Sequence, residues 1–173
     1  MILILYGDPA ICKARGKPAK HFPSPARRET MSTVTDYAAA PSTVAIEHFL
    51  KRLSVETDCA DVAAALKSAD QDFVLLHVVG TPEAYARRHV PGALHLPHRE
   101  ISAERMAEWP EDTLFVAYCA GPHCNGADQA ALKLARLGRP VKIMIGGITG
   151  WVDEGQPFAA GAEPGSLLSV AAE

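Results

Sequence analysis

The sequence predicts an α/β domain in which a parallel β-sheet is covered by helices on both faces. Short apolar runs such as residues 73–79 (FVLLHVV) are strand-sized and rich in β-branched residues, which is typical of strands buried on both faces. Segments with helical spacing of apolar residues alternate with these runs over about 115 residues, the arrangement that produces parallel sheets. At 173 residues and 48% hydrophobic composition, one domain with a sizeable core is expected.

Two short helices are expected before the first of these strands. The first helix begins at Ser42 or Thr43, either of which suits an N-cap. Its apolar residues fall on one helical face: Ile46, Phe49, Leu50 and Leu53. The second helix starts after Asp58 as its cap, continues through Val62 and Leu66, and ends before Asp70.

The remaining elements are expected to alternate after the strand at residues 73–79. A brief helix has Pro82 in its first turn, and Pro110 closes a later helix. A helix after the third strand carries an apolar stripe and ends at Gly138, a natural C-terminal stop. The other expected elements are strands at 92–97, 113–118 and 141–145, a helix at 101–109, and a short helix around Trp151.

The domain is expected to span residues 42–157, with flexible segments at 1–41 and 158–173. Residues 13–41 mix basic residues with Pro, Ser and Ala and show neither strand nor helix periodicity. Residues 158–173 are rich in Ala, Gly and Ser. Met31 is an alternative to Met1 as the start of translation.

Composition and charge exclude several classes of partner. The formal net charge of −3 gives no basic excess for nucleic acid or anionic lipid, so neither a nucleic-acid nor a membrane partner is expected. No apolar run approaches the roughly 20 residues that a bilayer requires. The apolar start, MILILY, is interrupted at Gly7 before it reaches the length of a signal-peptide core, so a cytoplasmic protein is expected. Four cysteines in a chain of this size indicate free thiols.

The segment VAYCAGPHCNG contains two cysteines and is the candidate for a reactive site. Cys119 follows a buried-strand candidate and comes just before a helix expected from about Gly126. In parallel α/β sheets, ligands bind beyond the carboxyl ends of the strands, where amides at helix N-termini face the site. We therefore expect the loop amides and the helix dipole to favour the Cys119 thiolate, which is a nucleophile.

Three motifs resemble those of the rhodanese-like (sulfurtransferase) family over roughly residues 56–157. The first is TPEAYARRHVPGALHLP, in which His89, Pro91, Gly92, Ala93 and Pro97 stand at matching positions. The second is the cysteine loop and its helix, VAYCAGPHCNGADQAA. The third is the closing Gly-Gly-x-x-x-Trp pattern at Gly146, Gly147 and Trp151. All three occur in the family's order and spacing.

The resemblance implies a rhodanese-like fold and a sulfurtransferase that uses Cys119 as its catalytic residue. The Cys119 thiolate would take a sulfane sulfur from a small anionic donor such as thiosulfate, hold it as a persulfide, and pass it to cyanide or to a thiol, including a protein thiol. No cofactor and no metal are implied. The active-site loop comprises Ala120, Gly121, Pro122, His123, Cys124, Asn125 and Gly126.

Two departures from the family keep a second function open. Val78 and Gly80 stand where the family has an Asp-x-Arg pair, and the active loop is longer than usual and lacks Arg and Lys. Cys124 is either a resolving thiol for Cys119 or a packed side chain. The alternative is therefore a non-enzymatic or redox-sensing module that uses both thiols. A zinc site and a phosphatase are disfavoured, the latter because Asn125 replaces the arginine that binds phosphoryl oxygens.

Overall fold

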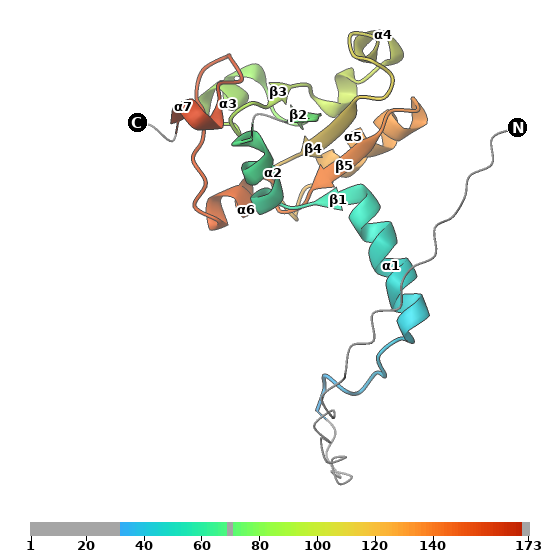
Figure 1. Cartoon of the computed structure of the whole chain (residues 1–173). Coiled ribbons are helices and arrows are strands. Elements are labelled where there is room, and N and C mark those ends of the chain that lie inside the picture. Colours follow the sequence, from blue (N-terminus) through green and yellow to red (C-terminus); the bar gives the residue numbers. More distant parts are fainter. Residues whose placement is uncertain (1–31, 69–70, 171–173) are drawn as a thin grey trace, which may run out of the picture. The chain divides into compact units, whose positions relative to one another are not determined.

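The computed structural model describes residues 32–68 and 71–170, and the fold is a five-stranded parallel sheet between two layers of helices (Figure 1). The strand order is β1-β5-β4-β2-β3, and every paired neighbour is parallel. The strands are β1 (Glu56–Thr57), β2 (Phe73–His77), β3 (Leu94–His95), β4 (Leu114–Tyr118) and β5 (Val141–Met144). The predicted parallel α/β architecture is confirmed.

Six of the seven α-helices that the structure describes occur where the sequence predicted a helix, one of them shorter than expected, and α7 was not predicted. They are α1 (Ser42–Val55), α2 (Cys59–Leu66), α3 (Pro82–Arg87), α4 (Ala103–Met106), α5 (Gly126–Arg136), α6 (Gly147–Asp153) and α7 (Leu167–Val170), with a 3₁₀ turn at His98–Glu100. Asp58 caps α2 by accepting from the Asp61 amide at 2.8 Å, as expected. Gly138 ends α5 with φ of +74°.

The helix predicted at residues 101–109 is only one α-helical turn, so this prediction was wrong in length. The Arg139 guanidinium donates to the carbonyl oxygens of Met106, at 2.6 Å, and of Trp109, at 3.1 Å. The Met106 carbonyl oxygen also accepts from the Trp109 amide at 3.3 Å, which is a turn and not α-helical spacing, and Pro110 has no N–H that could continue the helix. The two-residue edge strand β1 was not predicted, because so short a segment carries no alternation.

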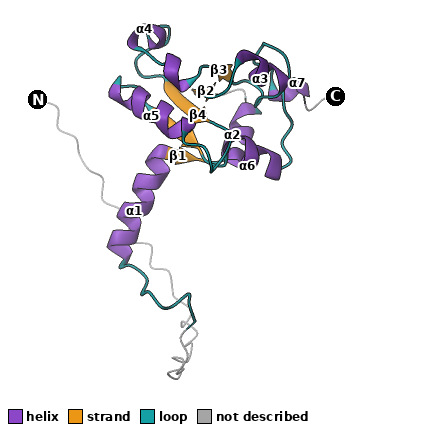
Figure 2. Ribbon diagram, turned by 180° about the vertical axis from the view of Figure 1, so that it is seen from behind, coloured by secondary structure: helices purple, strands orange, loops and turns teal. Residues whose placement is uncertain are grey.

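Two hydrophobic layers lie on opposite faces of the sheet because successive strand residues point in opposite directions. In β2, Leu75 packs against the layer of α2, α6 and α7, while Leu76 packs against the layer of α4 and α5. The same alternation along β4 directs Tyr118 to the first layer and Cys119 to the second. Helices α5 and α6 belong to different layers and lie on opposite sides of β4 (Figure 2). The sheet thus fixes the direction of the cysteine side chain.

Residues 158–170 are not the flexible tail that the sequence predicted. Ala159 and His89 exchange backbone hydrogen bonds, each of 3.0 Å, and the Leu167 side chain of α7 is only 1% exposed. The residue just before this segment is also held, since the Trp151 indole N–H donates to the Pro157 carbonyl oxygen at 2.8 Å. The prediction was wrong because it rested on the overall Ala, Gly and Ser composition, whereas a few apolar residues of this segment pack against the domain.

The N-terminal boundary is described only in part. The chain divides into two compact units, residues 1–40 and 41–173. Residues 1–31, for which a flexible extension was predicted, lie outside the described residues, and residues 32–40 are exposed throughout. No helix formed by residues 32–68 and 71–170 has the length and apolarity to cross a membrane.

Candidate active site

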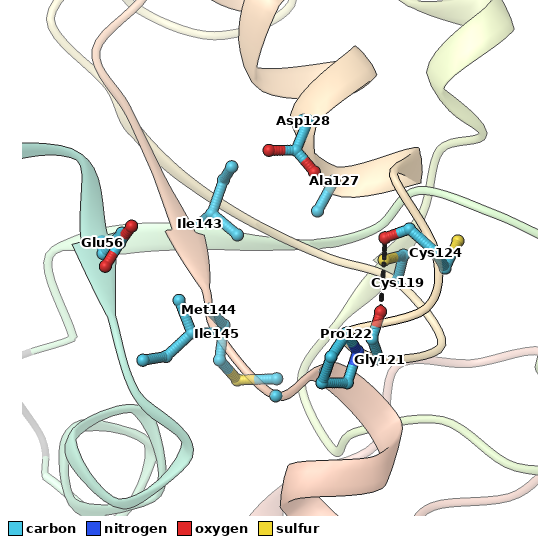
Figure 3. Close-up of a pocket in the computed structure, with 12 residues that line it drawn as sticks. Glu56, Cys119, Gly121, Pro122, Cys124, Ala127, Asp128, Ile143, Met144 and Ile145 are labelled. Atoms are coloured by element: carbon cyan, nitrogen blue, oxygen red, sulfur yellow. Dashed lines mark hydrogen bonds between the residues drawn. The ribbon is translucent and has the colours of Figure 1, made fainter. Parts of the chain in front are cut away.

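Cys119 is placed by the central strand of the sheet. It follows directly after β4, which lies between β2 and β5, and its side chain is 4% exposed. The Cys119 thiol donates to the Cys124 carbonyl oxygen, with Sγ···O of 3.1 Å, and more weakly to that of Gly121 at 3.9 Å (Figure 3). The loop from Ala120 to Asn125 therefore curls around the sulfur.

The first turn of α6 holds the backbone of the cysteine loop. The Ile148 amide donates to the Cys119 carbonyl oxygen at 3.0 Å, and the Thr149 amide and hydroxyl each donate to that of Ala120 at 3.1 Å. This approach requires a glycine, because a Cβ on Gly147 would lie 2.3 Å from the Cys119 carbonyl oxygen. Gly147 also has φ of +56°, which L side chains rarely adopt. The Gly-Gly pair, in which both residues have a positive φ, thus forms the tight turn before α6.

A cavity of about 260 Å³ opens beside Cys119 (Figure 3). Its walls come from the cysteine loop, the first turn of α5, the end of β5 and β1. The lining residues are Glu56, Cys119, Gly121, Pro122, Cys124, Ala127, Asp128, and the five residues from Ile143 to Gly147. Two carboxylates and no Lys or Arg are among them. The cavity therefore has an apolar wall at β5 and an acidic rim.

The predicted loop residues divide between the two sides of the loop. Cys119, Gly121, Pro122 and Cys124 line the main cavity, and His123 and Asn125 line a shallower hollow on its outer side. Ala120 and Gly126 line neither; Gly126 lies against Val79, where a Cβ would approach a Val79 methyl within 2.3 Å. The sequence analysis did not predict that Asp128 lines the cavity, although its position in the first turn of the helix that follows the cysteine loop was a usable signal. It also did not predict that Glu56 and the end of β5 line the cavity, because no motif near them in the sequence indicates a site.

The two loop thiols have opposite pKa shifts. Burial raises the pKa of Cys119 above its ordinary value of 9.0; the amides of Ala127 and Gly121 lower it, but they do not outweigh burial and the neighbouring Cys124. The pKa of Cys124 is lowered, because hydrogen bonds, led by that from the Gly126 amide, outweigh the effect of burial. The expected preference for the Cys119 thiolate is therefore not met with the loop in this conformation.

Cys124 lies close to Cys119 without facing it. The Gly126 amide donates to the Cys124 sulfur at 3.4 Å, and Figure 3 shows this sulfur turned away from that of Cys119. Cys59, Cys119 and Cys124 are all free thiols. Within the described ranges, no three His, Cys, Asp or Glu side chains come together as a metal site.

Three basic side chains close in sequence to the missing Asp-x-Arg pair, His77, Arg87 and Arg88, do not line the cavity. His77 ends β2 inside a cluster of aromatic and imidazole rings, where burial, followed by His95 and His89, lowers its pKa to about 4. The Arg88 guanidinium stacks over the Phe158 ring at 4.6 Å, and neither Arg87 nor Arg88 lines the cavity. His89 and His95 form hydrogen bonds with backbone carbonyl oxygens, which gives both rings a structural role.

The family model of the rhodanese-like domain matches residues 59–154, more than half of the chain. The chain belongs to the rhodanese-like domain family. The matched segment runs from α2 to the end of α6 and contains the cysteine loop and both glycines of the α6 turn. The family therefore covers the sheet from β2 to β5 and most of the candidate site.

The chain is also similar to individual proteins and to solved structures. A sulfurtransferase of Allochromatium vinosum is 36% identical over 92 residues, which cover 53% of this chain and 84% of that protein. The HTH-type transcriptional regulator Rv0324 of Mycobacterium tuberculosis is 36% identical over 110 residues, 60% of this chain and 48% of the regulator. The chain thus spans about half the length of that regulator. The crystal structure of the BH2092 protein of Bacillus halodurans superposes with a TM-score of 0.67 at 34% identity, covering 70% of this chain and 88% of that one.

Proposed function

We propose that this rhodanese-like domain is a sulfurtransferase in which Cys119 carries a sulfane sulfur as a persulfide. The observation that supports this most directly is the position of the Cys119 thiol at the carboxyl end of the central strand, facing a cavity of about 260 Å³. Amides of Gly121 and Ala127 act on the Cys119 sulfur. A persulfide anion formed there extends the negative charge toward the cavity, where backbone donors stabilise it.

The reaction proceeds in two displacements at sulfur. In the first, the Cys119 thiolate attacks the sulfane sulfur of thiosulfate, the sulfur–sulfur bond of the donor breaks, and sulfite leaves with its electron pair. In the second, cyanide or a thiolate attacks the outer sulfur of the persulfide and restores the Cys119 thiolate. The first step needs the Cys119 thiolate as the nucleophile. The second needs a persulfide that is accessible from the cavity, and the Cys119 thiolate is its leaving group.

Donor, acceptor and compartment are parts of the same proposal. Thiosulfate is the simplest anionic donor, and cyanide or a thiol, including a protein thiol, is the acceptor. The acidic rim at Asp128 disfavours dianions, so thiosulfate is expected to react slowly. A reducing cytoplasm suits the chemistry, since Cys119 and Cys124 must remain free thiols.

Intact mass spectrometry tests the proposal. Reduced protein exposed to thiosulfate should gain one sulfur, and cyanide should remove it. The gain should vanish in Cys119→Ser and persist in Cys124→Ser. Sulfur that is gained equally by Cys119→Ser would contradict the assignment of the carrier.

A second candidate function is a redox switch between Cys119 and Cys124. It is favoured by their shared loop, in which the Cys119 sulfur lies 3.1 Å from the Cys124 carbonyl oxygen, and by the lowered pKa of Cys124. A peroxide would oxidise one thiolate to a sulfenic acid, and the other thiol would then displace water to form the disulfide. Intact mass spectrometry after exposure to peroxide tests this function. The disulfide lowers the mass by two hydrogens, and this loss should require both cysteines.

A further inference from the structure

Helix α1 carries an apolar stripe that nothing in its compact unit buries. Ile46, Phe49, Leu50 and Leu53 recur at the spacing of one helical face and are 59%, 55%, 63% and 66% exposed. Helices α2 and α5 bury their apolar residues against the sheet, whereas α1, the longest described helix, has no buried residue. In Figures 1 and 2, α1 leaves the sheet at β1 and extends away from it.

The size of the stripe matches the apolar part of a protein interface. Four large side chains that are each more than half exposed present roughly 400 Å² of apolar surface, as much as the largest patch of an ordinary monomer. A standard interface buries about 800 Å² per partner, of which about 56–65% is apolar, or about 450–520 Å². The stripe alone thus supplies most of the apolar area that one side of a stable dimer needs.

The charges on α1 favour a protein partner over a lipid surface. Glu47 pairs with Lys51 at 2.6 Å and Arg52 pairs with Glu56 at 2.7 Å, so the charged side chains of this segment balance one another. Helices that lie on anionic bilayers instead carry an excess of Lys and Arg on the polar face. The segment has no such excess to attract a membrane.

We propose that α1 pairs with α1 of a second copy of this chain, antiparallel about a two-fold axis. A stripe with this spacing packs into the same stripe of another helix, and two-fold symmetry makes one patch serve both sides. Antiparallel pairing opposes the two helix dipoles and brings the acidic N-terminal half of one helix, at Glu47, beside the basic C-terminal half of the other, at Lys51 and Arg52. The proposal concerns a surface outside the cysteine site and does not depend on the proposed reaction.

Sedimentation velocity of the full chain over a range of concentrations tests this pairing. We expect the wild-type protein to show twice the mass of one chain and Leu50→Glu to sediment as a monomer. The matched control is Val44→Glu, because Val44 is 54% exposed on the same helix but away from the stripe. This control should remain a dimer.

Two further measurements make the result decisive. Far-UV circular dichroism and thermal unfolding identify any variant that has lost its fold; if Leu50→Glu is unfolded, Leu53→Gln takes its place. A wild-type protein that is monomeric at every concentration, or a folded Leu50→Glu that still dimerises, would overturn the proposal. So would a monomer that binds vesicles containing phosphatidylglycerol through the stripe.

Discussion

At the scale of single residues, the site depends on backbone that approaches Cys119 more closely than a side chain permits. The α6 amides bond the carbonyl oxygens of Cys119 and Ala120, and this contact exists because Gly147 has no Cβ. The cysteine loop is therefore held from two sides, by α5 through Gly126 and by α6 through Gly147. Its geometry depends on two glycines as much as on the thiol.

We predict that Gly147→Ala disrupts the site more than an ordinary glycine substitution. Gly138→Ala is the control, because Gly138 also has a positive φ, of +74°, but nothing lies within 4 Å of its added Cβ. The control should cost about 1 kcal/mol of unfolding free energy from backbone strain alone. Gly147→Ala should cost at least about 2 kcal/mol more and reduce sulfur uptake by Cys119, as measured by denaturant unfolding and intact mass. Equal costs for the two variants would contradict this account of the turn.

The opposite pKa shifts of the two loop thiols predict which one reacts first with iodoacetamide. At neutral pH, Cys124 should be alkylated before Cys119, because its pKa is below 9.0 while burial holds that of Cys119 above 9.0. Alkylation of Cys119 should increase about tenfold per pH unit until the pH passes its pKa. Peptide mass mapping across a pH series measures both rates, with Cys124→Ser as the reference for Cys119. Faster labelling of Cys119 at neutral pH would show that the loop amides prevail over burial in solution.

At the scale of elements, the first turn of α5 contributes both amides and a carboxylate to the site. Asp128 lines the cavity and raises the pKa of Cys124 through its charge, although the overall pKa of that thiol is lowered. The helix N-terminus attracts anions, whereas this carboxylate repels them. The element therefore favours a charged sulfur while it discourages a dianionic donor.

Asp128→Asn should accelerate sulfur uptake from thiosulfate by about two- to fivefold at low ionic strength, because removing one exposed charge changes a screened interaction by less than about 1 kcal/mol. The control is Asp112→Asn, because Asp112 precedes the amino end of β4, whereas Cys119 follows its carboxyl end. Initial rates of persulfide formation, with and without added salt, give the comparison. An Asp128→Asn variant that reacts no faster than the control would mean that the acidic rim does not limit the donor.

The C-terminal helix α7 has two adjacent leucines in contrasting environments. Leu167 is 1% exposed in the core, and Leu168 is 62% exposed. Leu167→Ala should lower the free energy of unfolding by about 2–4 kcal/mol, whereas Leu168→Ala should change it by less than about 0.5 kcal/mol. Denaturant unfolding of both variants measures the difference. Equal stabilities would contradict the docking of this segment in solution.

At the scale of the whole molecule, a buried histidine should make stability depend on pH. The pKa of His77 is about 4 in the folded protein, against 6.5 when unperturbed, because burial, then His95 and His89, disfavours its charged form. The unfolded chain therefore binds this proton at higher pH than the folded one, so the contribution of His77 is complete above pH 6.5 and is lost as the pH falls toward 4. The loss is on the order of 3 kcal/mol.

Equilibrium unfolding between these pH values tests the contribution of His77. His77→Gln should flatten the decline in unfolding free energy with falling pH, since glutamine does not titrate. His48→Gln, at an exposed position on α1, should retain the wild-type slope. Identical slopes for all three proteins would assign the acid sensitivity to other groups.

The sequence by itself determined the strands β2 to β5, the cysteine loop and its helix, and the glycine turn before Trp151. These features follow from alternation, helical spacing and turn residues, which are properties of neighbouring positions. The helical spacing also predicted the apolar stripe of α1, but it did not predict that the stripe stays exposed. The position of Cys119 at a strand end likewise follows from local order.

Only the tertiary structure decided what surrounds the thiol. The parallel strand order brings Glu56 and the end of β5 to the cavity from distant parts of the chain. In the same way, an amide of α6 bonds the Cys119 carbonyl oxygen. Docking of Leu167 and the raised pKa of Cys119 also depend on these distant contacts. The physical reason is that burial sums over all neighbours in space, whereas a sequence pattern records only neighbours along the chain.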